Sequence, residues 1–120
     1  MRRRDAEQGE LLKGHTPTLI LAVLAEAPRH GYAIAREIER RSRDALRLGE
    51  GSLYPALRAL EADGWVTSGW EPQPAGPARR VYSITEAGRA ELARRTQRWR
   101  QFAQIIEDVL AGGPYAPEPA

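Results

Sequence analysis

The alternation of apolar and polar positions predicts a mainly helical chain that carries one β-hairpin. Helical periodicity runs through four stretches, residues 16–28, 31–42, 52–64 and 85–111. Before the last of these, residues 65–70 and 79–84 predict two strands joined by a turn rich in proline and glycine. Three helices, a two-stranded wing and a long final helix predict a winged helix-turn-helix fold.

Local signals place the ends of the predicted helices. Thr16 and Pro17 predict an N-cap followed by the first helical position. Ser52 predicts the cap of the third helix, and Pro55 would then be its third residue, where the missing N–H breaks no helical bond. Gly64 predicts the end of that helix. Leucines at i, i+4 and i+7 of this helix predict its buried face.

The final helix is the longest predicted element, and it carries an unusual apolar stripe. Thr85 predicts its N-cap, and a carboxylate follows in the first turn. Apolar residues then recur at heptad-like spacing over about two heptads. They are Leu92, Trp99, Phe102, Ile106 and Val109. A lone small domain has little use for such a stripe, so it predicts pairing with a second copy.

Length and composition limit the possible functions. A chain of 120 residues suits a single compact unit with no separate catalytic domain. The positive N-terminus lacks the apolar stretch of a signal peptide, so we expect a cytoplasmic protein. The chain has no cysteine and only two histidines, so we expect no metal and no cofactor. The expected parts are residues 1–15 (N-terminal arm), 16–84 (winged helix), 85–111 (dimerisation helix) and 112–120 (disordered tail).

The charge pattern predicts a local DNA-binding surface, because the net charge of +2 is small. The third helix suits a major groove, with Tyr54 near a phosphate or base and Arg58 near a guanine edge. Arg79 and Arg80 at the hairpin suit phosphates or the neighbouring minor groove. Each has a simpler interpretation: Tyr54 packs on the core, Arg58 is solvated, and Arg79 pairs with Glu71.

Several ordered motifs resemble the PadR family of bacterial transcriptional regulators over about residues 10–111. They are His30-Gly31-Tyr32, Leu48-Gly49-Glu50-Gly51-Ser52-Leu53-Tyr54-Pro55-Ala56-Leu57, Leu60-Glu61, Gly64-Trp65-Val66 and Tyr82-Ser83-Ile84-Thr85-Glu86-Ala87-Gly88. The resemblance implies a homodimeric winged-helix repressor of a transporter, detoxification or stress gene, released by a small molecule or another signal. Such a dimer would bind a pseudo-palindromic operator.

The same resemblance assigns roles to particular residues. The DNA-binding residues would be Ser52, Tyr54, Pro55, Arg58, Arg79 and Arg80. The wing departs from the family pattern, since Ala78 and Val81 interrupt its basic and aromatic runs and three prolines stiffen its tip. The single final helix resembles the shorter subfamily, which dimerises through this helix and the N-terminal one. The expected interface is Leu11, Leu12, Leu92, Trp99, Phe102, Ile106, Val109 and Leu110.

The position of Trp99 within the stripe predicts an effector site. A two-fold axis would bring two Trp99 indoles together, and paired indoles can sandwich a planar aromatic compound, with Phe102 and Ile106 as the wall. Some relatives in the subfamily bind planar drugs in such a place. The alternative is that Trp99 is only a large interface residue.

Three other functions compete with this interpretation. An enzyme would need a nucleophile, base or metal cluster, and His30, the best general base, has no partner in a recognisable motif. We therefore expect no catalysis. A winged helix that serves only protein contacts is the second, and a winged-helix regulator of another family is the third. Salt-dependent binding to duplex DNA separates a DNA-binding protein from a protein-interaction module.

Overall fold

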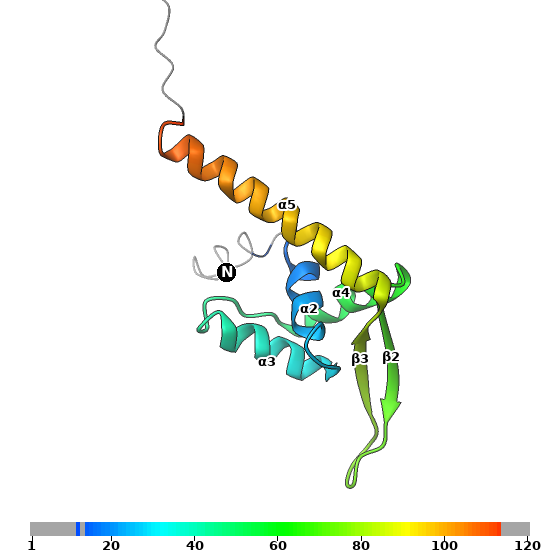
Figure 1. Ribbon diagram of the computed structural model, residues 1–120. Coiled ribbons are helices and arrows are strands. Elements are labelled where there is room, and N and C mark those ends of the chain that lie inside the picture. Colours follow the sequence, from blue (N-terminus) through cyan, green and yellow to red (C-terminus); the bar gives the residue numbers. More distant parts are fainter. Residues whose placement is uncertain (1–11, 13, 114–120) are drawn as a thin grey trace, which may run out of the picture.

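Three helices and a three-stranded antiparallel sheet form the body, and a long helix leaves it at one side (Figure 1). The computed structural model describes residue 12 and residues 14–113, so Leu11 and the expected tail from residue 114 onward lie outside it. The elements are α2 (Thr16–Leu24), β1 (Arg29–His30), α3 (Gly31–Arg41), α4 (Glu50–Ala62), β2 (Val66–Glu71), β3 (Arg79–Ile84) and α5 (Glu86–Leu110).

The sheet has one strand more than the pattern predicted. β3 lies in the middle, with β2 on one edge and β1 on the other. β1 contains only Arg29 and His30, which pair with Tyr82 and Val81 of β3. The predicted two-stranded wing is confirmed as β2 and β3. The short third strand was not predicted, because two residues are too few to show a strand periodicity.

The core lies where α2, α3 and α4 meet the root of the hairpin. α2 contributes on nearly every face, as a central scaffold helix does. The buried apolar side chains are Ile20, Leu21, Val23, Leu24, Ile34, Ile38, Leu48, Leu53, Leu57, Leu60, Val66 and Tyr82. The predicted i, i+4, i+7 leucines of α4 are all among them, so that prediction is confirmed.

Two predicted helix starts were wrong, one by a single residue and the other by three. His15 is the N-cap of α2, and Thr16 is already helical. α4 begins at Glu50 after Gly49, whose carbonyl accepts the N–H groups of the third and fourth helical residues. Pro55 therefore lies at the sixth helical position and leaves one exposed backbone carbonyl without its helical donor. Gly49, with no side chain to cap, gives a weaker sequence signal than a serine.

The junction between the hairpin and α5 agrees with the sequence. Thr85 is the N-cap of α5, and its Oγ1 accepts the Gly88 N–H at 3.0 Å. The same hydroxyl donates to the Gly64 carbonyl at 2.7 Å, and the Thr85 N–H donates to the Trp65 carbonyl at 3.1 Å. The start of α5 is thus attached to the end of α4.

The arrangement is a winged helix-turn-helix with a long C-terminal helix. α3 and α4 form the helix pair, and β2 and β3 project beyond the body as the wing (Figure 1). Within residue 12 and residues 14–113, no helix combines the length and apolar character needed to span a membrane.

Candidate nucleic-acid interface

The outward face of α4 carries mostly short side chains and one cation. Ser52, Pro55 and Arg58 are exposed there, whereas Leu53 and Leu57 on the opposite side are buried. The other exposed residues of this helix between its first and last turns are glycine or alanine. A face of small side chains lets a helix approach a groove closely, and Arg58 stands out from it.

Tyr54 is half-buried, because its ring lies over the start of α3. A Cβ built on Gly31 would lie 2.8 Å from Tyr54 Cε1 and 2.9 Å from its hydroxyl. The simpler interpretation of Tyr54, packing of its ring, therefore describes its position. A shallow cavity of about 300 Å³ opens here, lined by His30, Gly31, Tyr32, Tyr54, Arg79, Arg80 and Tyr82. Burial raises the pKa of the Tyr82 phenol, so this residue stays neutral beside the arginines.

The two wing arginines differ in their surroundings. Arg80 Nε donates to Ser68 Oγ at 2.8 Å, and Arg80 Nη2 lies 3.5 Å from Glu61 Oε2. Arg79 lies opposite Glu71 in the register, but within residues 14–113 it makes no ion pair. The pairing of Arg79 with Glu71 that the sequence allowed is therefore not formed, and Arg79 is the wing cation that faces solvent unneutralised.

Three residues near the wing were missed by the sequence reasoning. Glu61 on α4 accepts a hydrogen bond from Ser68 Oγ at 3.0 Å, and the Arg80 guanidinium lies over the Trp70 ring, 5.6 Å from its centroid. The sequence did contain a signal, because Val66, Ser68 and Trp70 occupy every second position of β2 and therefore share one face. The strand pattern does not indicate, however, that Glu61 of α4 lies against this face.

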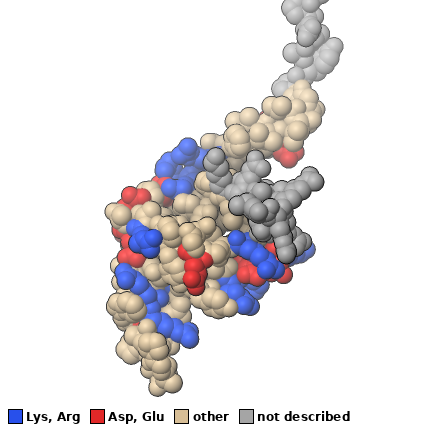
Figure 2. Space-filling view, turned by 180° about the vertical axis from the view of Figure 1, so that it is seen from behind, with Lys and Arg blue, Asp and Glu red and all other residues tan. Residues whose placement is uncertain are grey.

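The charges are distributed locally. Figure 2 shows basic side chains near the root of the projecting hairpin, basic and acidic groups interleaved over the body, and the outer part of α5 mostly uncharged on the face in view. The local pattern agrees with the small net charge of the sequence, and it separates a charged body from a mostly uncharged helix end.

The outer half of α5 presents large apolar side chains to solvent. Leu92 packs against the core cluster of its own protomer, as does Leu12. Further along the helix the exposed side chains are Trp99, Phe102, Ile105, Ile106, Val109 and Leu110. Ile105 was not predicted, because it lies between the heptad positions. Figure 1 shows the reason for the exposure: α5 extends past α2, so its outer turns have no neighbour among the described elements.

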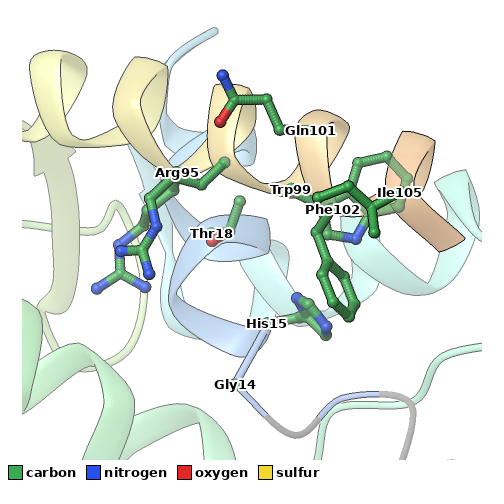
Figure 3. A pocket seen from close by; sticks show the side chains of 9 residues that line it. Gly14, His15, Thr18, Arg95, Trp99, Gln101, Phe102 and Ile105 are labelled. Carbon is green, nitrogen blue, oxygen red and sulfur yellow. The ribbon is translucent and has the colours of Figure 1, made fainter.

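A cavity of about 500 Å³ lies beside this apolar stretch (Figure 3). Trp99 and Phe102 are among the residues that line it, whereas Ile106 is not, and Ile105 lines it instead. His15 at the start of α2 points toward Phe102 from the other side. The remaining lining residues are Gly14, Thr18, Arg95, Arg98 and Gln101.

Arg95 connects this cavity to the region where α4 and the wing meet. Its guanidinium lies over the Trp65 ring, 5.3 Å from the centroid, and its Nε donates to buried Glu91 at 2.6 Å. Hydrogen bonds from Arg94 and Arg95 lower the pKa of the Glu91 carboxyl, so it remains ionised. Trp65 lies three residues beyond the last residue of α4, and its N–H donates to the Leu60 carbonyl at 3.0 Å. Arg95 therefore lines the cavity and also contacts the residue that is hydrogen-bonded to the end of that helix.

No chemistry beyond binding is assembled around these residues. Within residue 12 and residues 14–113, no group of three or more histidines, cysteines or carboxylates is placed to hold a metal ion. His30, the one candidate base, lies in β1 with its Nε2 buried and without a hydrogen-bond partner in the described part of the chain.

A helix pair with an exposed second helix, an arginine-bearing wing and a long terminal helix define the class of winged helix-turn-helix transcriptional regulators. Comparison with known families narrows the class. Residues 20–94 match the transcriptional regulator PadR-like family, and the chain belongs to that family. It is therefore a DNA-binding transcriptional regulator and not an enzyme.

Individual relatives agree with the assignment. The chain is 40% identical to the transcriptional regulator Rv3488 of Mycobacterium tuberculosis over 93 residues, 78% of this chain and 80% of that protein. A PadR family regulator of Clostridium difficile superposes with a TM-score of 0.70 at 30% identity, covering 81% of this chain and 99% of the other. A regulator of Clostridium thermocellum gives a TM-score of 0.76 at 25% identity, covering 82% and 96%.

Proposed function

We propose that this protein is a homodimeric repressor, acting in the cytoplasm, that binds a pseudo-palindromic operator. The observation that supports the dimer is the apolar face of α5. One end of this face packs against the core of the same protomer, and the rest of it is exposed. Leu92 on this face contacts the core of its own protomer, and Trp99, two helical turns further out, is 53% exposed. A second copy of the same face is the natural partner, since a two-fold interface joins identical patches.

In such a dimer two copies of α4 would lie about one DNA turn apart, roughly 34 Å, and enter successive major grooves. Arg58 is proposed to read a base edge, with Ser52, Tyr54 and Pro55 at the backbone beside it. Arg79 and Arg80 are proposed to hold the wing at the neighbouring minor groove. Exposure supports these roles for all but Tyr54, whose half-buried ring leaves its hydroxyl beside the wing arginines.

Fluorescence anisotropy across a salt series tests the DNA interface. The probe is the labelled duplex from upstream of the protein's own gene, with a scrambled duplex as control. Selective binding that weakens steeply with salt supports the proposal, because neutralised phosphates release counterions. Weak binding without a salt dependence would support a winged helix that serves protein contacts.

An effector site is proposed at the cavity beside Trp99 and Phe102, with Ile106 adjoining it on the apolar face. Planar aromatic compounds are the expected class, because two indoles brought together by a two-fold axis would stack on both faces of such a ring. Binding there would reach Trp65 through Arg95, which gives a physical route to release from DNA.

The neutral probe 1-aminoanthracene tests the effector site in the absence of DNA. Trp99→Ala is expected to abolish the quenching of protein fluorescence and the heat of binding measured by calorimetry. Gln104→Ala, at an exposed position on the opposite side of α5, serves as the control. Undiminished heat in Trp99→Ala would remove Trp99 from the site and favour a purely structural role.

A further inference from the structure

One face of the hairpin is buried in the core at its root and exposed to solvent toward its tip. This face carries Val66, Ser68 and Trp70 of β2. On β3 it carries Tyr82, which pairs with Ser68, and Arg80, which pairs with Trp70. At the root, Val66 and Tyr82 are buried in the core. Toward the tip the same face leaves the core, and Trp70 is 68% exposed. The outer part of this face is free to meet a ligand.

A single carboxylate of α4 holds this part of the hairpin. The Ser68 hydroxyl donates a hydrogen bond to Glu61 Oε2 at 3.0 Å and accepts one from Arg80 Nε–H at 2.8 Å. Arg80 Nη2 also lies 3.5 Å from the same Glu61 oxygen. The serine thus uses its donor and its acceptor at once, and all three side chains have their partners only when wing and helix keep this relative position.

The same network supports an exposed indole. Arg80 lies over the Trp70 ring, 5.6 Å from its centroid, while its other side is held by Ser68 and Glu61. An exposed tryptophan is unfavourable in water, and here a cation on its face fixes its orientation. Arg79, the next residue of β3, lies opposite Glu71 on the other face of the hairpin and has no ion pair within the described residues. An exposed indole on one face of the wing and an unpaired cation on the other suit a wing that enters a groove, where sugar edges and phosphates lie on both sides.

We propose that Glu61 is a positioning residue, which fixes the wing relative to α4 through Ser68 and Arg80, and that the fixed wing presents Trp70 as a further DNA-contacting residue. The inference rests on the proposed DNA interface and adds residues to it. Failure of the wild-type protein to bind any duplex would overturn the proposed function, whereas the variants below bear on the wing network alone.

The sign of the effect of Glu61→Gln tests the positioning role. Removing a negative charge near DNA should strengthen binding if the charge has no other role. If Glu61 holds the wing, affinity for the labelled upstream duplex falls about fivefold despite the gain in net charge. Glu71→Gln is the matched control, since Glu71 is an exposed carboxylate of the same hairpin without an ion pair within residues 14–113, and its affinity should rise or stay constant. Stronger binding by Glu61→Gln would overturn the positioning role.

A double-mutant cycle shows whether Glu61 acts through Arg80. Arg80→Gln alone should weaken binding, and adding Glu61→Gln to it should cost no further affinity, because the partner is already absent. Independent, additive losses would contradict the network. Thermal melting of each variant by circular dichroism confirms that the chain is folded at the temperature of the binding assay.

Trp70→Ala tests the contact itself. The exposed position means that the variant folds, and affinity is expected to fall about tenfold, because truncation of a tryptophan removes a large contact area from an interface. The salt slope should stay that of the wild type, because no phosphate charge pair is lost, whereas Arg79→Ala should reduce the slope by about one. Thr67→Ala, on the opposite face of the same strand, is the control and should bind normally. Wild-type affinity in Trp70→Ala would remove Trp70 from the interface.

Discussion

The ring of Tyr54 on α4 occupies the space that a side chain on Gly31 would need. The close approach of 2.8 Å to a built Cβ explains why glycine stands at the first position of α3. It also means that the two helices of the DNA-binding pair are aligned by a ring against bare backbone. A tyrosine beside the wing arginines is thereby held in one orientation.

Gly31→Ala is expected to push the Tyr54 ring away and to weaken DNA binding, at a cost in stability of about 1 kcal/mol. In a Tyr54→Ala background the obstructing atoms are gone, so the same glycine substitution should be neutral or slightly stabilising. Chemical denaturation and anisotropy on all four proteins give the cycle. An equal cost in both backgrounds would show that the ring is not what excludes a side chain at Gly31.

Arg58→Ala is expected to weaken specific DNA binding by roughly 1–3 kcal/mol, because it removes the one cation on the outward face of α4. Within residue 12 and residues 14–113 the exposed side chain makes no hydrogen bond or ion pair, so melting temperature and oligomeric state should not change. Gel shifts with the upstream duplex measure the effect, and Ala59→Ser, at an exposed neighbouring position, is the control. Unchanged operator affinity would show that Arg58 does not read a base.

Val109→Asp is expected to convert the proposed dimer into a folded monomer. Val109 is exposed in the single chain, so the carboxylate is solvated and costs little there, but burial of two such charges across a two-fold axis is strongly unfavourable. Gln104→Asp places the same group on the opposite side of α5 and should leave the assembly intact. Light scattering after size-exclusion chromatography distinguishes the states. Equal masses for both variants would exclude this face as the interface.

Gly88→Ala should destabilise the protein by at least about 2 kcal/mol. A Cβ at this position would lie 2.1 Å from the Trp65 carbonyl oxygen, and backbone cannot move aside as a flexible side chain does. Gly51→Ala, which meets no atom within 4 Å in α4, should instead raise the free energy of unfolding by about 0.5–1 kcal/mol. Urea denaturation of the two variants should give changes of opposite sign.

Glu37 should contribute a pH-dependent part of the stability. Hydrogen bonds from Arg40 and Arg41 lower the pKa of this carboxyl from 4.5 to about 2. Because the folded pKa is depressed, the contribution is complete above about pH 4.5 and disappears as the pH falls toward about 2. The stability gap between wild type and Glu37→Gln should therefore close over this range in denaturation measured at successive pH values. A gap that stays constant would contradict the ion-paired state.

The sequence predicted elements whose signals are local and periodic. The leucine spacing of α4, the cap at Thr85 and the second strand of the hairpin were predicted correctly, because each depends on neighbouring residues only. The start of α4 was predicted too late, since a serine within the first turn is a stronger cap signal than the glycine that occupies the position. β1 exists only through its pairing with β3, which no local pattern records.

In the candidate site, too, the features set by local periodicity were predicted and those set by tertiary packing were not. Arg58 and Pro55 lie on the outward face that helical geometry predicts, and Trp99 and Phe102 line one cavity. The contacts of Glu61 with Ser68 and Arg80 depend on the angle between α4 and the wing. That angle follows from tertiary packing, so periodicity gives no access to it.

The length of α5 has a mechanical consequence. Its 25 residues span about 37 Å, with the unpartnered apolar turns at one end and the attachment to α4 at the other. If two such helices cross at their outer ends, a change of about 5° in the crossing angle moves the two attachment points by about 3 Å relative to each other. In such a dimer the two copies of α5 would act as levers. A compound bound where they cross would then change the distance between the two copies of α4 without contacting either of them.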